Sequence, residues 1–215
     1  LHPPLLPVLG RESPLERVAA GGLPGLDELR LHQSTVWTWN RAIYDPKDSG
    51  HLRIELRALP AGPTVVDMVA NGAFHFGLTL ALSEQMDALL PALPFVHAYG
   101  NFIRAARHGL DAELLWPADA APSPRPVSVV ELVPRLLPLA RQGLVSAGVE
   151  PSEADAMLGI IERRVAQKRT GARWQREVLA RLEGRMPRQD ALAAMLERYL
   201  HHADSGEPVH AWPVE

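Results

Sequence analysis

The alternation of apolar and polar residues predicts a β-hairpin near the start of the chain. The segment Gln33–Tyr44 is rich in β-branched and aromatic residues, DPKDSG then supplies turn chemistry, and a second extended run, HLRIELRAL, follows. In this second run Leu52, Ile54 and Leu56 alternate with charged residues, and successive side chains of a strand point to opposite faces. We therefore expect one face of the hairpin to pack and the other to be charged.

The pattern then changes to that of a helix over residues 65–82. Two prolines and a glycine in PAGPT end the strand, and Thr64 can cap a helix with Asp67 three positions later. Apolar residues cover most of the circumference, so this helix is expected to be central and buried nearly all round. Asp67, Asn71 and His75 interrupt the apolar run, which favours a buried helix over a membrane span.

Helices dominate the rest of the chain. Four segments carry apolar residues at three- and four-residue spacing: Phe95–His108, Val129–Ala147, Ser152–Leu182 and Arg188–His202. Pro134 and Pro138 predict a kink or a late start in the second of these segments, because proline removes a backbone donor.

We expect a single domain over residues 1–215. It would comprise an extended run-in at 1–30, the hairpin at 31–60, the central helix at 64–86 and a helical region at 95–204. A Pro-rich loop at 117–126 is the only plausible internal boundary. The predicted fold class is α+β, predominantly helical, with a short antiparallel hairpin packed on a helical bundle.

Composition narrows the classes of function. The 22 basic and 25 acidic residues give a formal charge of -3, which gives no reason to expect a nucleic-acid-binding surface. The absence of cysteine excludes disulfides, thiolate metal sites and a Cys nucleophile. No serine-hydrolase, Walker or dinucleotide-binding motif occurs, and the N-terminus LHPPLLPVLG lacks the features of a secretory signal. We expect a cytoplasmic protein with neither nucleic acid nor membrane as partner.

The charged face of the second strand is the most informative local feature. Arg53, Glu55 and Arg57 aim a cation, a carboxylate and a cation into one space, to which Asn40 and Arg41 of the preceding strand add polar groups. A solvated ladder of ion pairs explains such a row as well as a site does. Phosphoryl transfer needs carboxylate oxygens for Mg²⁺ and guanidinium groups for the phosphoryl oxygens. One carboxylate cannot hold the metal, so further ligands would have to come from elsewhere.

Two other charged features have structural interpretations. Asp67 is better explained as a helix-capping residue than as a metal ligand. The basic run at 162–176 is better explained as a solvated helix face than as an anion site, and the step Thr170-Gly171 suggests a break in the helix there.

Part of the sequence resembles a known family. HQSTVWTWNRAIYDP, followed by GHLRIELRALPAGPTVVDMVANGAFHFGL, is similar to a stretch of bacterial proteins of the glutamate–cysteine ligase type, over residues 31–82. The R-x-E-x-R strand is also similar to the late metal-ligand strand of glutamine synthetases. Residues 169–175 and 199–213 look like closing segments of the ligase family. The resemblance implies a glutamine synthetase-like fold of which only the C-terminal half is present.

The resemblance also implies chemistry. It implies an enzyme that uses ATP and Mg²⁺ to convert a substrate carboxylate to an acyl phosphate, from which an amine displaces phosphate to form an amide. Glu55 would be a Mg²⁺ ligand and Arg57 the arginine that stabilises the transferring phosphoryl group. Arg53, the second candidate catalytic residue, and Arg41 would be secondary contacts to phosphate or to the substrate carboxylate. The candidate cofactor-binding residues are Arg41, Asn40 and Trp39.

The chain departs from the family pattern because the N-terminal half, with its early acidic strand, is absent. We therefore expect a fragment that is incomplete alone and that needs the missing half or a second copy as partner, besides small-molecule carboxylate and amine substrates. Unpaired hairpin edges also invite association. The alternative is a non-catalytic helical assembly or regulatory domain derived from the same scaffold.

Overall fold

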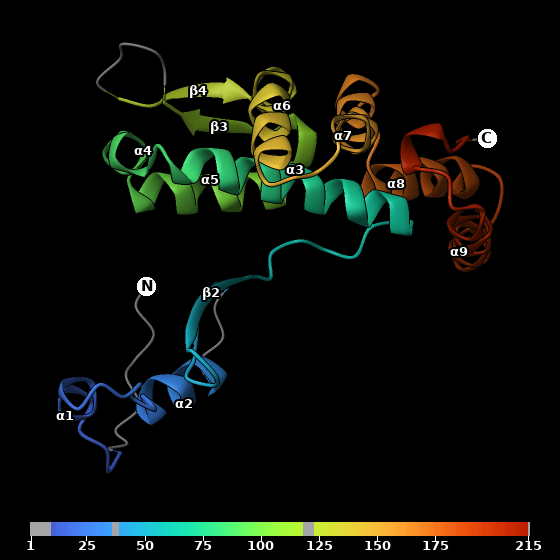
Figure 1. Cartoon of the computed structure of the whole chain (residues 1–215). Helices are drawn as coiled ribbons and strands as arrows, with labels where there is room; N and C mark the ends of the chain where they lie inside the picture. The colour runs from blue at the N-terminus through green and yellow to red at the C-terminus, as the bar shows by residue number, and fades with distance from the viewer. Residues whose placement is uncertain (1–9, 36–38, 118–122, 215) are drawn as a thin grey trace. The chain divides into compact units, whose positions relative to one another are not determined.

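The computed structural model describes residues 10–35, 39–117 and 123–214. Backbone contacts divide the chain into an N-terminal unit, Leu1–Pro60, and a C-terminal unit, Ala61–Glu215 (Figure 1). Helices dominate and strands occur as short antiparallel pairs, which confirms the predicted α+β class with a predominance of helix. The sequence-based assignment of all 215 residues to one domain stays a prediction.

The N-terminal unit contains two helices and a hairpin. Its elements are α1 (Pro14–Ala19), α2 (Asp27–Thr35), β1 (Asn40–Asp45) and β2 (His51–Leu56). The strands pair antiparallel from Asn40 opposite Leu56 to Asp45 opposite His51, which confirms the hairpin.

The predicted run-in at 1–30 was expected to be extended. Its described part instead contains helix α1 and the start of helix α2. Proline stands at the start of α1, and Asp27 and Glu28 lie in the first turn of α2, where carboxylates favour the helix dipole. Helix α2 also takes Gln33 and Ser34 from the first predicted strand. These local end signals outweigh the β propensity of the residues that follow.

The exposure of the two faces of this hairpin differs from the prediction. Within the N-terminal unit, Leu52 and Ile54 of the apolar face are 76% and 62% exposed. Helix α2 packs on β1 and hydrogen-bonds to Arg41 of the charged face, whose guanidinium donates to the Gln33 carbonyl. The expectation that the apolar face packs is therefore wrong for Leu52 and Ile54 in this unit.

The C-terminal unit is built on three packed helices, α3 (Val65–Ser83), α6 (Val129–Ser146) and α7 (Pro151–Ala166). As predicted, Thr64 caps α3, and its Oγ1 accepts the Asp67 N–H at 3.1 Å. Helix α6 begins at Val129 and contains both prolines, so the late start is wrong. Its N-cap Ser128, which accepts from the Val130 N–H, provides the start signal.

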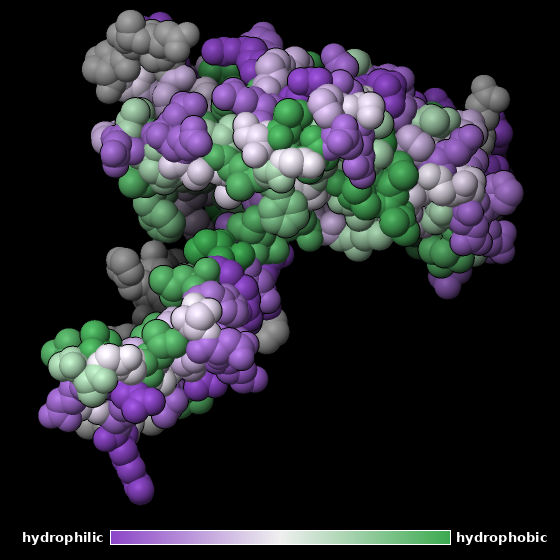
Figure 2. Space-filling model, in the orientation of Figure 1, coloured by the Kyte–Doolittle hydropathy of each residue, from purple (hydrophilic) through white to green (hydrophobic). Residues whose placement is uncertain are grey.

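Helix α3 is buried on one side only, which corrects the expectation of burial all round. Val65 is 70% exposed and Phe76 is 56% exposed, because α6 and α7 cover a single face. Apolar side chains are visible in green on the surface of this unit in Figure 2. Among the described helices, α3 is the one whose length and composition would also suit a membrane span. Helix α3 packs on α6 and α7 through one face, and Asp67 is fully buried.

A second hairpin lies within the C-terminal unit. Helices α4 (Met86–Ala92) and α5 (Phe95–His108) are followed by the 3₁₀ turn η1 (Gly109–Asp111), and β3 (Glu113–Trp116) then pairs antiparallel with β4 (Arg125–Ser128). This hairpin packs on α5 and α6. The sequence predicted only a loop at 117–126, of which residues 118–122 lie outside the described part. The buried Asn101 stabilises β3, because its side chain both donates to and accepts from the backbone of Leu115 at 2.7 Å.

The segment expected as one helix at 152–182 divides into α7 and α8 (Gly171–Glu183), which confirms the break at Thr170-Gly171. Helix α9 (Arg188–Ser205) and the 3₁₀ turn η2 (Val209–Ala211) follow. The predicted solvated face at 162–176 is wrong for Arg164, which is 9% exposed and pairs with Asp67. Trp174 and Trp212 meet edge to face, 5.2 Å apart, in the core of this end of the unit.

Candidate functional site

The pairing of β1 with β2 sets which charged side chains share a face. Arg41 lies opposite Glu55, and Ile43 lies opposite Arg53. Because residues directly opposite each other point to the same side of a sheet, Arg41, Arg53 and Glu55 share one face. Arg57, two residues beyond Glu55, continues the row.

Two arginines converge on the single carboxylate of this row. The Arg41 Nε lies 2.5 Å from the Glu55 Oε2, and the Arg57 Nε lies 3.8 Å from the same oxygen. The side chains of Arg41 and Arg57 are 23% and 22% exposed, so both guanidinium groups are largely withdrawn from water. The Arg41–Glu55–Arg57 cluster has a formal charge of +1, which favours an anionic ligand.

Arg53 has different neighbours. Its Nη1 lies 3.8 Å from the Asp45 Oδ2 and 2.6 Å from the His51 Nε2. The backbone N–H of Lys47 lowers the pKa of Asp45, and the charges of His51, Lys47 and Arg53 act in the same direction. Asp45 is therefore a stable anion that engages Arg53. The structure brings Arg41, Glu55 and Arg57 together. Arg53 lies on the same face but forms its ion pair with Asp45.

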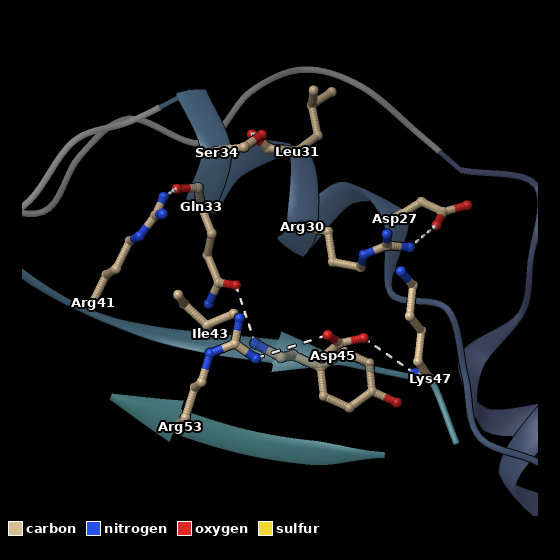
Figure 3. Close-up of a pocket in the computed structure, with 11 residues that line it drawn as sticks. Asp27, Arg30, Leu31, Gln33, Ser34, Arg41, Ile43, Asp45, Lys47 and Arg53 are labelled. Atoms are coloured by element: carbon tan, nitrogen blue, oxygen red, sulfur yellow. Dashed lines mark hydrogen bonds and ion pairs between the residues drawn. The ribbon is translucent and has the colours of Figure 1, made fainter. Parts of the chain in front are cut away.

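A cavity of about 540 Å³ opens between α2 and this face of the hairpin (Figure 3). Its lining consists of Asp27, Arg30, Leu31, Gln33, Ser34, Arg41, Ile43, Tyr44, Asp45, Lys47 and Arg53. Four of these residues are cationic and two are anionic, so an anion is the favoured occupant. Of the residues predicted for the site, Arg41 and Arg53 line the cavity.

Asn40 and Trp39 contact the backbone of Arg57. The Arg57 N–H donates to the Trp39 carbonyl at 3.1 Å and to the Asn40 Oδ1 at 3.3 Å. These bonds extend the hairpin ladder past Leu56 and fix the start of the Arg57 side chain. In this structure the two residues position Arg57, and their predicted contact with a cofactor stays a prediction.

Glu55 does not by itself provide a magnesium site. Mg²⁺ prefers octahedral coordination by oxygen, and Glu55 is one carboxylate that already engages two guanidinium groups. Within residues 10–35, 39–117 and 123–214, no cluster of three or more His, Asp or Glu side chains could hold a metal ion. The described residues therefore do not fit a resident Mg²⁺ ion without ligands from elsewhere.

Sequence reasoning missed the contribution of α2 to this site. Asp27, Arg30 and Gln33 were assigned to a run-in or to a strand, yet all three line the cavity. The pair of acidic residues at 27 and 28 was the available signal, because acidic residues are enriched in the first turn of helices. Nothing local indicates that this helix covers the charged face.

Comparison with known proteins gives one consistent relationship. Three curated proteins of Mycobacterium sp. match, two named "Putative glutamate–cysteine ligase 2-1" (strains KMS and JLS) and one "Putative glutamate–cysteine ligase 2" (strain MCS). Each is 32% identical to this chain over 105 residues, which is 47% of this chain and 28% of the relative. No family model and no solved structure matches. The match supports a glutamate–cysteine ligase-like relationship at family level.

Proposed function

We propose that this chain, as a relative of glutamate–cysteine ligases, supplies the phosphoryl-binding strand of an ATP-dependent carboxylate–amine ligase. The observation that carries the proposal is the convergence of Arg41 and Arg57 on Glu55. The Arg41 guanidinium on β1 and the Arg57 guanidinium directly after β2 are preorganised for the negative charge that develops during phosphoryl transfer. The family-level similarity supports the same reaction class.

The reaction has two steps. A carboxylate oxygen of the first substrate attacks the terminal phosphorus of ATP, which releases ADP and leaves an acyl phosphate. The amine nitrogen of the second substrate then attacks the acyl carbon, phosphate leaves, and the nitrogen loses a proton to give the amide. Arg57 and Arg53 would neutralise the phosphoryl oxygens, and Arg41 would hold Glu55 and orient the terminal phosphate.

The resemblance makes Mg²⁺ a cofactor with Glu55 among its ligands. The described residues supply one carboxylate at this site, so the remaining ligands would come from outside the described residues. The match spans 28% of the length of each relative. We therefore propose that activity requires the part of the ligase that lies outside the matched region, or a second copy, in the cytoplasm, with a small-molecule carboxylate and amine as substrates.

Replacing Glu55 distinguishes two roles of this side chain, that of a Mg²⁺ ligand and that of an ion-pair partner of Arg41 and Arg57. In the assembled ligase, where the remaining metal ligands are present, we expect titration calorimetry of Glu55→Gln to show that Mg²⁺ no longer tightens ATP binding. Affinity for ATP without Mg²⁺ should be equal or higher, because Arg41 and Arg57 lose their counter-ion. Mg²⁺ enhancement equal to that of the unmodified chain would remove Glu55 from the metal site.

The exposed face of α3 favours a second candidate, a non-catalytic assembly domain. Val65, Val69 and Phe76 are at least half exposed, and contiguous exposed apolar residues mark interaction surfaces. Light scattering separates the candidates when combined with ATP titration. An oligomer without ATP binding favours assembly, and ATP binding that depends on the hairpin arginines favours the ligase.

A further inference from the structure

An exposed row of leucines runs along α9, at one end of the C-terminal unit (Figure 1). Leu192, Leu196 and Leu200 are 40%, 53% and 53% exposed. Residues four apart lie on one face of a helix, so these three side chains form a ridge. The other side of α9, with Ala191 and Met195, packs into the core of this end of the unit. Single exposed leucines are ordinary on a protein surface, but contiguous apolar surface is typical of an interaction site.

A charge stands at each end of this ridge, and the two charges have opposite signs. Arg188 is the first residue of α9 and lies four residues before Leu192. Asp204 is the last residue of α9 but one and lies four residues after Leu200. The Arg188 side chain is 72% exposed and pairs with Glu183, and a guanidinium group has enough N–H donors to engage a second carboxylate. In the part of the chain that the structure describes, no ion pair to Asp204 is found.

Both end charges oppose the dipole of their own helix. A helix dipole favours acidic side chains at its N-terminus and basic side chains at its C-terminus. Asp190 and His202 of α9 follow this preference. Arg188 at the N-terminus and Asp204 near the C-terminus reverse it. An antiparallel neighbouring helix would stabilise both, because it brings its negative end to Arg188 and its positive end to Asp204. The end charges therefore favour an antiparallel helix as the partner of this face.

We propose that a second copy of this chain occupies the face, through antiparallel pairing of α9 with α9 about a twofold axis at Leu196. In this register Leu192 lies against Leu200 of the second copy, and the two Leu196 side chains meet at the axis. Arg188 lies against Asp204 of the second copy, so an ion pair forms at each end. Rows of residues four apart interdigitate in the commonest class of helix packing. One row supplies both sides of the contact, which is what a twofold interface requires.

The size of this interface sets the expected affinity. The row supplies far fewer residues than the about 20–30 on each side of a standard interface. We therefore expect a weak dimer, with a dissociation constant in the micromolar range. The pairing does not depend on the ligase function of the hairpin, and its face is separate from the exposed face of α3.

Sedimentation equilibrium of the full chain across the micromolar range measures this association. We expect a monomer–dimer equilibrium that Leu196→Glu weakens about tenfold or more, because two carboxylates then meet at the axis. Val65→Glu is the matched control, because it adds the same charge at an apolar residue of α3 that is 70% exposed. It should leave the dissociation constant unchanged. Circular dichroism melts show that the fold is retained, as expected for substitution of a half-exposed side chain.

Exchange of the end charges tests the antiparallel register. Asp204→Arg should weaken association, because it sets cations against each other at both ends of the ridge. It should not lower the melting temperature of the monomer, because a cation suits the C-terminus of its own helix. Combining it with Arg188→Asp should restore association, because each end again carries opposite charges.

A chain that stays monomeric throughout the micromolar range would overturn the proposal. So would a dimer that Val65→Glu dissociates and Leu196→Glu does not, which would assign the interface to α3. Failure of the double exchange to restore association would overturn the antiparallel register. ATP binding enters none of these measurements, so the outcome is independent of the function proposed for the hairpin.

Discussion

At the scale of single residues, Asp67 connects α3 to two distant segments, α7 and η2. Its side chain is fully buried and pairs with Arg164 of α7 at 2.5 Å. It also accepts the Val209 N–H of η2 at 3.0 Å and the Thr64 hydroxyl at 2.9 Å. Local spacing predicted the cap at Thr64. It could not predict a partner 97 residues away, because such contacts depend on the tertiary fold.

Replacing this carboxylate should destabilise the chain. We expect Asp67→Asn to lower the free energy of unfolding by about 3–5 kcal/mol, the usual cost of leaving a buried charge without its partner. Urea denaturation followed by circular dichroism measures the change. Asp155→Asn is the control, because Asp155 pairs with Arg141 at the exposed surface and its loss should barely move the midpoint. Equal midpoints for the two variants would contradict this role of Asp67.

The contact of α3 with α6 is the main packing feature at the scale of elements. A Cβ added to Gly77 would lie 2.3 Å from the Ala140 carbonyl oxygen, and one added to Gly143 would lie 2.0 Å from the Gly77 carbonyl oxygen. The two backbones therefore approach each other directly. Helix periodicity predicted both helices but not this approach, since the pattern of apolar residues does not specify which glycines face each other.

This close contact makes Gly77→Ala unfavourable. Alanine raises helix propensity by about 1 kcal/mol, but the overpacking should still give a net loss of about 1–3 kcal/mol in the free energy of unfolding. Gly72→Ala in the same helix is the control, because its Cβ would meet only the Phe76 ring, at 3.9 Å, and should stabilise the chain. Thermal melts of both variants test this, and a Gly77→Ala melting temperature at or above that of the unmodified chain would rule out the contact.

Periodicity was most reliable for the long helices. It gave the starts of α3, α5 and α9 at Val65, Phe95 and Arg188, because each carries several turns of apolar spacing. It missed the four-residue strands β3 and β4, which are too short to show an alternation and depend on Asn101 and on each other. The hairpin arginines were found from alternation, and the α2 side of their cavity was not.

At the scale of the whole molecule, partly buried histidines couple stability to pH. Burial lowers the pKa of His75, His202 and His210 below their ordinary value of 6.5. His210 Nε2 accepts from the Arg163 Nε–H at 3.0 Å, which requires this ring nitrogen to be unprotonated.

The unfolded chain therefore binds more protons than the folded chain as pH falls through and below 6.5. Stability should be fully present above that pH and should decrease on acidification. Melting temperatures across this range measure the decrease, and His210→Gln should reduce it. A melting temperature that rises on acidification from neutral pH would contradict the expectation.

We propose that the hairpin face binds the phosphoryl groups of ATP, and Arg57→Gln tests this most directly. The measurement is the affinity of the full chain for ATP in the presence of Mg²⁺, compared with Arg57→Gln and with Arg17→Gln. Arg17 is an exposed arginine of α1 in the same unit, 58% accessible at its side chain. We expect Arg57→Gln to lower the affinity for ATP about tenfold or more and Arg17→Gln to leave it unchanged. Undetectable ATP binding by the unmodified chain, or equal affinity in all three proteins, would contradict it.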